Sequence, residues 1–427
     1  MVASSLVAIL AILPVFGFAQ DLGVPLSWRK FSNSRPVSER ISISQNAINQ
    51  ILPQLNSGTG EFNGIGYWQS GNVWTTMANQ DRFAGSNVNQ ARVVNNLNLV
   101  FNLRANYDQF GVCCYYILTD VPDFDFRPLN SSSMMMRCGW WAQAAIAGYR
   151  AYKDNNLLSH AVATWNHVSN YVITQSQANA GRNPNKNFQL SGQCDGSTMA
   201  GGVFWRPTTD DQSVNSVTTG QTTHLDNPIL RLYLTTSALL AEITGDSKYT
   251  NAAILSAQWI RNLNINSNNI VLDTVNGHDC SRSPASWLFT YNSGKFLEGL
   301  SVLADVTGDS QWRTLMVNTA AAAMKNAPWQ GSDGIITEGS STTENNDGVG
   351  FKAIFIRGLC EVFARNPSNT DLRILIHSYT DVQYNALLDL AANGNVYSAN
   401  WHGPPQGFTT WGQLAALDVL GSAIIAN

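Results

Sequence analysis

The chain has 427 residues and a formal net charge of −4, with charged residues making up 13% of it. That charged share is about half of what globular proteins usually carry. No run of Lys or Arg occurs, so nucleic acid is excluded as a ligand, because its phosphates demand concentrated positive charge. A weakly charged polar surface with 13 Trp and 13 Tyr suits a carbohydrate, whose faces stack on aromatic rings, although most such rings belong to the core of a protein.

Residues 1–19 are typical of a secretory signal peptide. The apolar run from Leu6 to Phe18 is too short to span a bilayer, and Gly17-Phe18-Ala19 forms a small-residue cleavage site. No later segment is apolar and long enough to span a membrane. We therefore expect a secreted, extracellular protein, free or attached to a cell wall, and we expect it to be a monomer.

Four stretches further along the chain share one pattern, an apolar helix, a short turn rich in Gly, Asp or Asn, and a second apolar helix. They span 140–171, 232–260, 296–324 and 351–390, and residues 42–110 add one or two further units. Gly245 and Gly308 suit the left-handed position that ends a helix, and Asp246 and Asp309 suit the cap of the next one.

Helical hairpins of this kind must stack to bury their apolar faces. The sequence therefore predicts an all-α fold, an (α/α) barrel that forms a single domain over residues 20–427. A long solenoid is the alternative. The unequal connections, rich in Gly, Trp and Asn, fit a barrel with loops on one rim better.

Six cysteines in a secreted chain permit disulfides. Cys194 and Cys280 lie in loop-like surroundings rich in Gly and Ser and are the favoured pair. Cys360 lies in an apolar helical run, which predicts a buried thiol. The six His show no metal-binding spacing, so we expect no metal, and nothing in the chain implies an organic cofactor.

Several short motifs, in their order and spacing, resemble one family. They are Trp140-Trp141 at the start of a helix, Gly-Gly-Val-Phe-Trp at 201–205, Tyr-Asn-Ser-Gly at 291–294, the segment 333–338, and Asp347 followed by Phe351, Lys352 and Arg357. The chain resembles glycoside hydrolase family 76, the endo-α-1,6-mannanases of the six-hairpin glycosidase superfamily, in a fungal form. The resemblance implies an (α/α)6 barrel and endo-acting, retaining hydrolysis of α-1,6-linked mannose.

The family carries two adjacent aspartates shortly before the tandem Trp, one as nucleophile and one as acid/base. Counting back from Trp140, those positions hold Met136 and Arg137. Retaining hydrolysis needs two carboxyl groups about 5–5.5 Å apart. Methionine transfers no proton, and arginine would repel the developing positive charge of the sugar. As written, the chain is expected to be inactive or nearly so.

A shifted reading frame accounts for the missing pair. If Asn-Asp-Asp-Ala-Met-Trp is encoded AAT GAT GAT GCG ATG TGG, reading one base late gives Met-Met-Met-Arg-Cys-Gly, the sequence of residues 134–139. Our hypothesis is that the suspect insertion near 112–138 is translated intron from a faulty gene model, with a second remnant at 221–231. The alternative is a genuine insertion in a diverged paralogue without catalytic activity.

The resemblance and the local composition together give a candidate substrate-binding set. It comprises Trp140, Trp141, Gly201, Gly202, Phe204, Trp205, Tyr291, Asn292 and Asp347. Each has a structural alternative: a core ring, an ordinary turn, a helix cap at Asn292, or an ion pair of Asp347 with Lys352. Asp210 and Asp211 form the only adjacent acidic pair left, and solvated loop acids are the commoner interpretation of such a pair.

We therefore expect an α-1,6-mannan hydrolase fold whose partner is α-mannan or a mannosylated glycoprotein. The alternative is a non-catalytic mannan-binding or carbohydrate-binding protein on the same fold. A third possibility, another enzyme such as a glucosidase or a polysaccharide lyase, fits less well. A lyase acts on acidic chains, and this sequence has no basic cluster.

Overall fold

The computed structural model describes residues 21–108, 138–206, 208–217, 232–343 and 348–426. Four sequence predictions lie outside the described residues. These concern the signal peptide, the positions Met136 and Arg137, the suspected remnant at 221–231, and Asp347.

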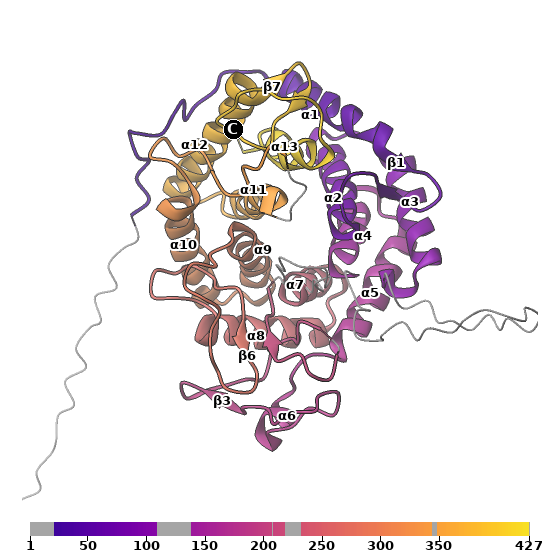
Figure 1. Ribbon diagram of the computed structural model, residues 1–427, viewed down its shortest axis with the longest axis vertical. Helices are drawn as coiled ribbons and strands as arrows, with labels where there is room; N and C mark the ends of the chain where they lie inside the picture. The colour runs from indigo at the N-terminus through magenta and orange to yellow at the C-terminus, as the bar shows by residue number, and fades with distance from the viewer. Residues whose placement is uncertain (1–20, 109–137, 207, 218–231, 344–347, 427) are drawn as a thin grey trace, which may run out of the picture.

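Two concentric rings of helices make up the described part of the chain (Figure 1). The inner ring consists of α2 (Tyr67–Ala84), α4 (Cys138–Tyr152), α7 (Tyr233–Thr244), α9 (Thr290–Thr307), α11 (Gly348–Arg365) and α13 (Thr410–Ser422). The outer ring consists of α1 (Val37–Ile51), α3 (Gln90–Leu103), α5 (Asn155–Ser169), α8 (Ser247–Leu263), α10 (Ser310–Met324) and α12 (Thr370–Ala386). Inner and outer helices alternate along the chain, which is the topology of an (α/α)6 barrel.

Burial follows this layering. Inner helices are buried on nearly every face, as in α2, where all residues from Tyr67 to Asp81 are buried. Outer helices bury a single stripe, as in α3, where only Val93, Leu97 and Val100 are buried. The main hydrophobic core therefore lies between the two rings.

Short turns lead from each inner helix to the outer helix that follows, and the sequence predicted two of them correctly. Gly245 and Gly308 adopt left-handed φ angles of 69° and 65° at the ends of α7 and α9. The side chains of Asp246 and Asp309 accept hydrogen bonds from the first-turn amides of α8 and α10. These connections are tight, in contrast to the long ones at the other end of the barrel.

The connections from outer to inner helices are much longer and hold the remaining structure. They contain α6 (Gln175–Ala180), the 3-10 turns η1 (Leu52–Gln54), η2 (Ala105–Tyr107) and η3 (Ala327–Trp329), and the π turn η4 (Leu387–Ala391). They also contain four antiparallel two-stranded pairs, β1 (Leu55–Asn56) with β2 (Glu61–Phe62), β3 (Gln193–Cys194) with β4 (Ser197–Thr198), β5 (Ser213–Val214) with β6 (Val275–Asn276), and β7 (Ala392–Asn393) with β8 (Val396–Tyr397).

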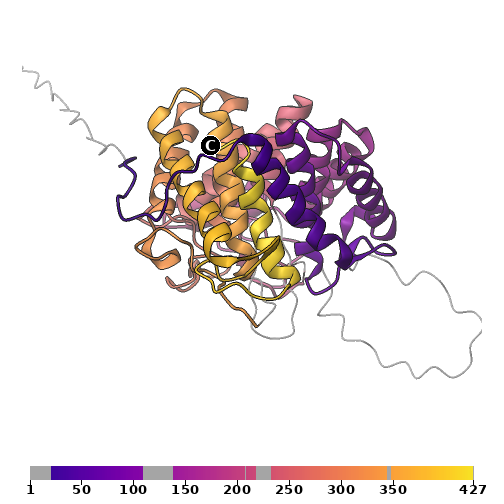
Figure 2. The ribbon, with the colours of Figure 1, turned by 90° about the horizontal axis from the view of Figure 1, so that it is seen from above.

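The pair β5–β6 differs from the other three, because it joins two separate connections, those before α7 and before α9. In the side view of Figure 2 the helices stand roughly along one direction, and the loop of residues 387–409 lies at one end of them. We call this end, where the inner helices begin, the mouth of the barrel.

The sequence pattern missed one inner helix. It placed no unit over α13, the last inner helix, which packs against α1, α2 and α11 and so closes the ring between α11 and α2. Helix α13 is buried on all sides, with almost every residue from Thr410 to Ser422 buried, so it lacks the one-sided periodicity that reveals an amphipathic helix.

Candidate functional site

A second, smaller hydrophobic cluster lies at the mouth, separate from the main core. This mouth cluster consists of Trp68, Trp140, Leu232, Tyr291, Phe351 and Ile354, with the partly buried Phe289 packed on it. Most members come from the first turn of an inner helix, so the barrel topology brings them together. Tyr291 and Phe351 stack with ring centres 4.0 Å apart, and the rings of Trp68 and Trp140 are 5.4 Å apart.

Two buried polar atoms at this site have no hydrogen-bond partner within the described residues. They are Nε1 of Trp140, a donor, and Oδ1 of Asn292, an acceptor. Buried polar groups in folded proteins are nearly always satisfied by protein or water. An unpaired donor and an unpaired acceptor beside aromatic rings are what a sugar, with its apolar faces and its hydroxyl groups, would complement.

Asp273 supplies a carboxylate to the same region. Its Oδ1 accepts hydrogen bonds from the Tyr291 hydroxyl (3.4 Å) and from Nδ2 of Asn292 (3.1 Å). Burial raises the pKa of Asp273 to about 6, and the hydrogen bonds from Asn292 and Tyr291 oppose that rise. Asn292, expected as a binding residue or a helix cap, thus orients a buried acid. A carboxyl group in this pKa range can donate as well as accept a hydrogen bond near neutral pH.

Glu338 and Lys352 form a second buried polar pair at the mouth. Glu338 accepts hydrogen bonds from the backbone amide and the hydroxyl of Thr290, the first residue of α9. Burial raises the pKa of Glu338 to about 7, against the effects of the Thr290 hydrogen bonds and the Lys352 charge. Burial also lowers the pKa of Lys352 to about 7, and the Lys352 ammonium donates to the carbonyl oxygen of Ala399. Both side chains therefore fix the loops around α9 and α11.

The tandem Trp divides between two environments. Trp140 belongs to the mouth cluster, whereas Trp141 is part of the main core. Nε1 of Trp141 donates to the Tyr67 carbonyl oxygen at 3.0 Å, and its ring lies 4.8 Å from the Tyr67 ring. For Trp141 the structure favours the alternative of a core ring over direct contact with a sugar.

The two glycines of the Gly-Gly-Val-Phe-Trp motif pack against an outer helix. A Cβ on Gly201, whose φ is +94°, would lie 2.4 Å from the Leu255 carbonyl oxygen of α8. A Cβ on Gly202 would lie 2.8 Å from Nε1 of Trp259, also on α8. These glycines allow the connection before α7 to lie close on α8, which is a packing role.

The aromatic half of that motif is also covered by protein. Phe204 is buried beneath the Lys186 ammonium, 4.3 Å from its ring centre. The Arg206 guanidinium lies 4.8 Å from the ring centre of Trp205. Asp211 accepts hydrogen bonds from the backbone amides of Arg206 and Ser213 and so holds the loop. Burial raises the pKa of Asp211, against the attraction of Lys186.

Asp210, the neighbour of Asp211, is exposed. The two side chains therefore differ in environment, one at the surface and one turned into its own loop. Asp210 thus fits the interpretation of a solvated loop acid, whereas Asp211 is a partly buried acid that holds its loop.

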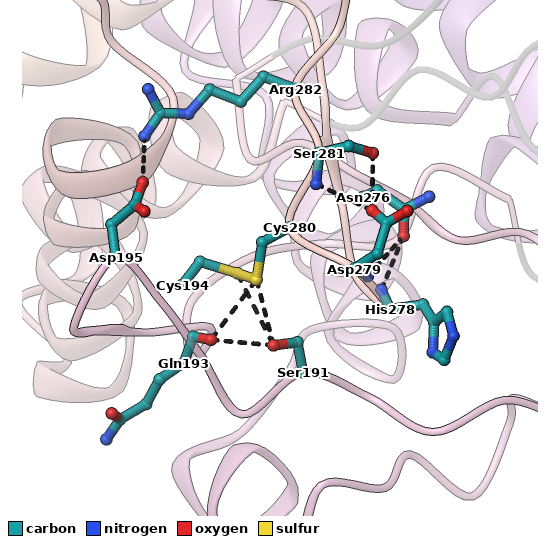
Figure 3. The surroundings of a disulfide bond; sticks show 10 residues. All are labelled: Ser191, Gln193, Cys194, Asp195, Asn276, His278, Asp279, Cys280, Ser281 and Arg282. Carbon is teal, nitrogen blue, oxygen red and sulfur yellow. Dashed lines mark hydrogen bonds and ion pairs between the residues drawn. A yellow bond between two sulfur atoms is a disulfide. The ribbon is translucent and has the colours of Figure 1, made fainter.

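A disulfide ties together the two connections that flank the mouth beside α9. Cys194 and Cys280, the pair favoured by the sequence, are bonded, with Cα atoms 5.6 Å apart (Figure 3). Next to it Arg282 forms an ion pair with Asp195 at 2.9 Å. Cys360 is a buried free thiol, as predicted.

Sequence reasoning did not single out Trp68, Phe351 or Asp273 as candidate site residues. A signal for the first existed, because Tyr67-Trp68 repeats at α2 the aromatic pair that Trp140-Trp141 forms at α4. In both pairs one ring enters the mouth cluster and the other the main core. Asp273 is a single acid after the apolar run 270–272 and has no local signature.

Among the described residues, no three His, Cys, Asp or Glu side chains gather where they could hold a metal ion. Within that same part of the chain, no helix combines the length and apolarity needed to cross a bilayer.

Comparison with known proteins identifies the family. The family model described as glycosyl hydrolase family 76 matches residues 185–427, more than half of the chain. The chain belongs to glycosyl hydrolase family 76. A search of the curated proteins finds no match to it.

Solved structures related to family 76 share the fold. The α-1,6-mannanase of Salegentibacter sp. HEL1_6 is 14% identical, with a TM-score of 0.66 over 91% of this chain and 100% of its own. An inactive variant of that enzyme, with two adjacent aspartates replaced by alanine, was solved with α-1,6-mannotetrose; it is 14% identical, with a TM-score of 0.65 over 91% of this chain and 99% of its own.

A third structure, Dfg5 from Chaetomium thermophilum in complex with glucosamine, is 16% identical. Its TM-score is 0.64 over 93% of this chain and 92% of its own. At these identities the likeness concerns the fold alone, and it confirms the predicted (α/α)6 barrel.

Proposed function

We propose that this protein binds α-1,6-linked mannan at the mouth of its barrel. The observation that carries the proposal is the mouth cluster, where aromatic rings lie beside a buried donor on Trp140 and a buried acceptor on Asn292 that the described residues leave unpaired. Asp273, in the connection before α9, adds a carboxyl group that is hydrogen-bonded to the first turn of that helix. Aromatic faces with a few convergent polar atoms are the usual composition of a carbohydrate site.

The choice of glycan follows from the family. A solved relative with this fold holds α-1,6-mannotetrose, and family 76 includes α-1,6-mannanases. The proposal includes secretion, through the predicted signal peptide at residues 1–19, and an extracellular mannan or mannosylated glycoprotein as the natural partner.

We further propose that the chain as written binds without cleaving. The positions that correspond to the two aspartates of the family hold Met136 and Arg137, outside the described residues. The relative that lost two adjacent aspartates to alanine is described as inactive. Loss of both carboxylates removes nucleophilic and acid catalysis together, which a binding groove alone does not replace.

Retaining hydrolysis is the second candidate function, and one observation favours it. Residues 134–139 are what the family motif becomes when it is read one base late. If the natural message encodes Asn-Asp-Asp-Ala-Met there, the protein is an endo-acting mannan hydrolase with the site described above.

The first experiment separates the two functions. Residues 20–427 are expressed and applied to a column of immobilised α-1,6-mannan, and released oligosaccharides are measured in parallel. We expect retention without release. Trp140→Phe, which keeps an aromatic ring but removes the indole donor, is expected to weaken binding about fivefold while the melting temperature stays close to that of the parent. A folded parent chain that passes unretained would refute the proposal.

Sequencing the transcript across codons 105–145 decides the gene-model hypothesis. A mature message that encodes Met-Met-Met-Arg-Cys removes the hydrolase candidate. A message with the aspartate pair makes the corrected protein the one to assay, and that protein should release oligosaccharides with retention of anomeric configuration.

A further inference from the structure

One aromatic side chain near the mouth is exposed rather than buried. Trp287 is 42% exposed, and it is the only aromatic residue among the large apolar side chains that are exposed in the described part of the chain. The others are aliphatic: Leu26, Val37, Val88, Leu103 and Ile374. A single exposed apolar side chain is common on protein surfaces, but an indole exposed beside other aromatic rings offers a face on which a ligand can stack.

A continuous series of ring contacts connects Trp287 with the mouth cluster. The ring centre of Trp287 is 6.4 Å from that of Phe289, and Phe289 is 5.6 Å from Phe351. Phe351 is 6.1 Å from Trp68, which is 5.4 Å from Trp140. The series runs from the surface to the start of α4, immediately after the positions that correspond to the family's aspartates.

The segment that carries Trp287 is held in place at both ends. Before it, the Cys194–Cys280 disulfide and the ion pair of Arg282 with Asp195 fix the strand that leads outward (Figure 3). At Trp287 itself, the backbone amide donates to the Pro284 carbonyl oxygen at 2.8 Å. After it, the Leu288 carbonyl oxygen accepts a hydrogen bond from the indole of Trp329. A fixed ring loses little entropy when a ligand stacks on it.

We propose that Trp287 and Phe289 form an outer subsite that stacks on a mannosyl unit of an α-1,6-linked chain whose other units lie at the mouth of the barrel, beside the mouth cluster. This inference rests on the proposed function. It adds that the protein distinguishes long chains from short ones, because only a chain long enough to extend from the mouth cluster reaches Trp287. The Cys194–Cys280 disulfide then positions a ligand contact in addition to stabilising the loop.

Calorimetric titration with α-1,6-mannotriose and with α-1,6-mannohexaose tests the inference. Trp287→Ala is expected to lower the affinity for the hexaose about fivefold to tenfold and to leave the affinity for the triose unchanged. Trp287→Tyr should keep most of the affinity for the hexaose, because a ring remains. Ile374→Ala, at a side chain 50% exposed on α12, is the matched control and should change neither affinity.

The positioning role of the disulfide is tested in the same assay. The double variant Cys194→Ser and Cys280→Ser should bind the hexaose more weakly than the parent, as Trp287→Ala does. Adding Trp287→Ala to the double variant should then lower the hexaose affinity by a smaller factor than it does in the parent. Equal hexaose affinity of Trp287→Ala and the parent overturns the outer subsite, and so does an equal loss for both ligands. If the folded parent binds neither ligand, the proposed function fails and this inference fails with it.

Discussion

At the scale of single residues, Asp273 shows how burial sets the chemistry of the site. The side chain is only 2% exposed, and its hydrogen bonds come from Tyr291 and Asn292 of the same helical turn. These bonds favour the carboxylate, but desolvation outweighs them and raises the pKa to about 6. Below that pH the folded protein presents a neutral acid that can donate to a sugar oxygen, and above it a carboxylate that only accepts.

This raised pKa predicts a pH dependence of stability. The unfolded chain releases the Asp273 proton near the ordinary value of 3.8 and the folded chain near 6, so folding takes up a proton between these values. Stability should fall as pH rises from about 4 to about 6 and remain lower above that. Asp273→Asn removes the cost of burying an ionised carboxylate. We expect this variant to be more stable than the parent at pH 8 by on the order of 3 kcal/mol. Denaturant unfolding at pH 3.5 and pH 8 checks this, and a gain of equal size at both values would contradict it.

At the scale of elements, the contact between α9 and α11 depends on two glycines that allow the helix backbones to touch. A Cβ on Gly358 would lie 2.1 Å from the Gly294 carbonyl oxygen, and a Cβ on Gly294 would lie 2.5 Å from Cα of Phe355. The opposing atoms belong to backbone and cannot move aside as a flexible side chain can. This close approach sets the positions of Tyr291 and Phe351, whose rings stack at the starts of these two helices.

Gly358→Ala should therefore force α9 and α11 apart. We expect a loss of about 1–3 kcal/mol in the free energy of unfolding, the usual cost of overpacking, together with weaker mannan binding as the two rings separate. Gly407→Ala is the matched control, because a Cβ there meets no atom within 4 Å. Denaturant unfolding and the mannan column measure the two effects. A Gly358→Ala protein as stable as the control variant would show that the helices adjust freely.

At the scale of the whole molecule, buried charges lie inside the inner ring and connect its ends. The Arg357 guanidinium of α11 makes two hydrogen bonds to Asp418 of α13, at 2.8 and 2.7 Å, and a third to Asn72 of α2 at 2.7 Å. It thus joins the last inner helix to the first. Deeper in the same ring, Lys295 pairs with Glu298.

A second group of charges lies toward the short turns. Burial raises the pKa of Glu361, but the charges of Arg150, Arg82 and Arg365 outweigh it and hold that pKa well below its ordinary value. Among the described residues, Arg82, Arg150 and Arg365 thus share the Glu361 carboxylate. Such pairs need not add stability in total, but removal of one partner leaves an uncompensated charge.

The buried ion pair of Arg357 with Asp418 predicts that removing one of the two charges destabilises the protein far more than removing both. Asp418→Leu should lower the free energy of unfolding by about 3–5 kcal/mol, because it leaves the buried Arg357 charge without a carboxylate partner between three inner helices. Adding Arg357→Met should recover most of that loss, since an apolar pair replaces a charged one. Asp210→Ala, at an exposed loop position, serves as the control and should stay within about 0.5 kcal/mol of the parent. Additive losses in the double variant, measured by denaturant unfolding, would show that the two charges do not depend on each other.

Much of the barrel was predictable because its signals are local. The helix, turn, helix pattern, the capping residues Asp246 and Asp309 and the left-handed Gly245 and Gly308 depend on contacts within one or two turns of chain. The same is true of the loop composition around Cys194 and Cys280. Helix α13 escaped prediction because no short turn joins it to a following outer helix, so it lacks the helix, turn, helix pattern that revealed the other inner helices.

The candidate site was predictable only where aromatic residues open a helix. Trp140 and Tyr291 were identified in this way, and Tyr67-Trp68 could have been, by the same signature. Gly201 and Gly202 were expected to lie against a sugar or to form an ordinary turn, yet a Cβ on either would meet protein, Leu255 of α8 for Gly201 and Val214 of β5 and Trp259 of α8 for Gly202. A pair of glycines indicates that another group lies close to the backbone, but it does not indicate whether that group is a ligand or another part of the protein.

The sequence by itself determined most of the helices, their caps and the likeness to the family, because these depend on residues that are close together in the chain. Only the tertiary structure decided which ring of each aromatic pair enters the mouth cluster, that Asp273 lies against Asn292, and that Trp287 continues the series of rings to the surface. The physical reason is the closure of the ring, which brings the first turns of inner helices far apart in the chain to one end of the barrel. Burial at that end then fixes side-chain environments that no local pattern encodes.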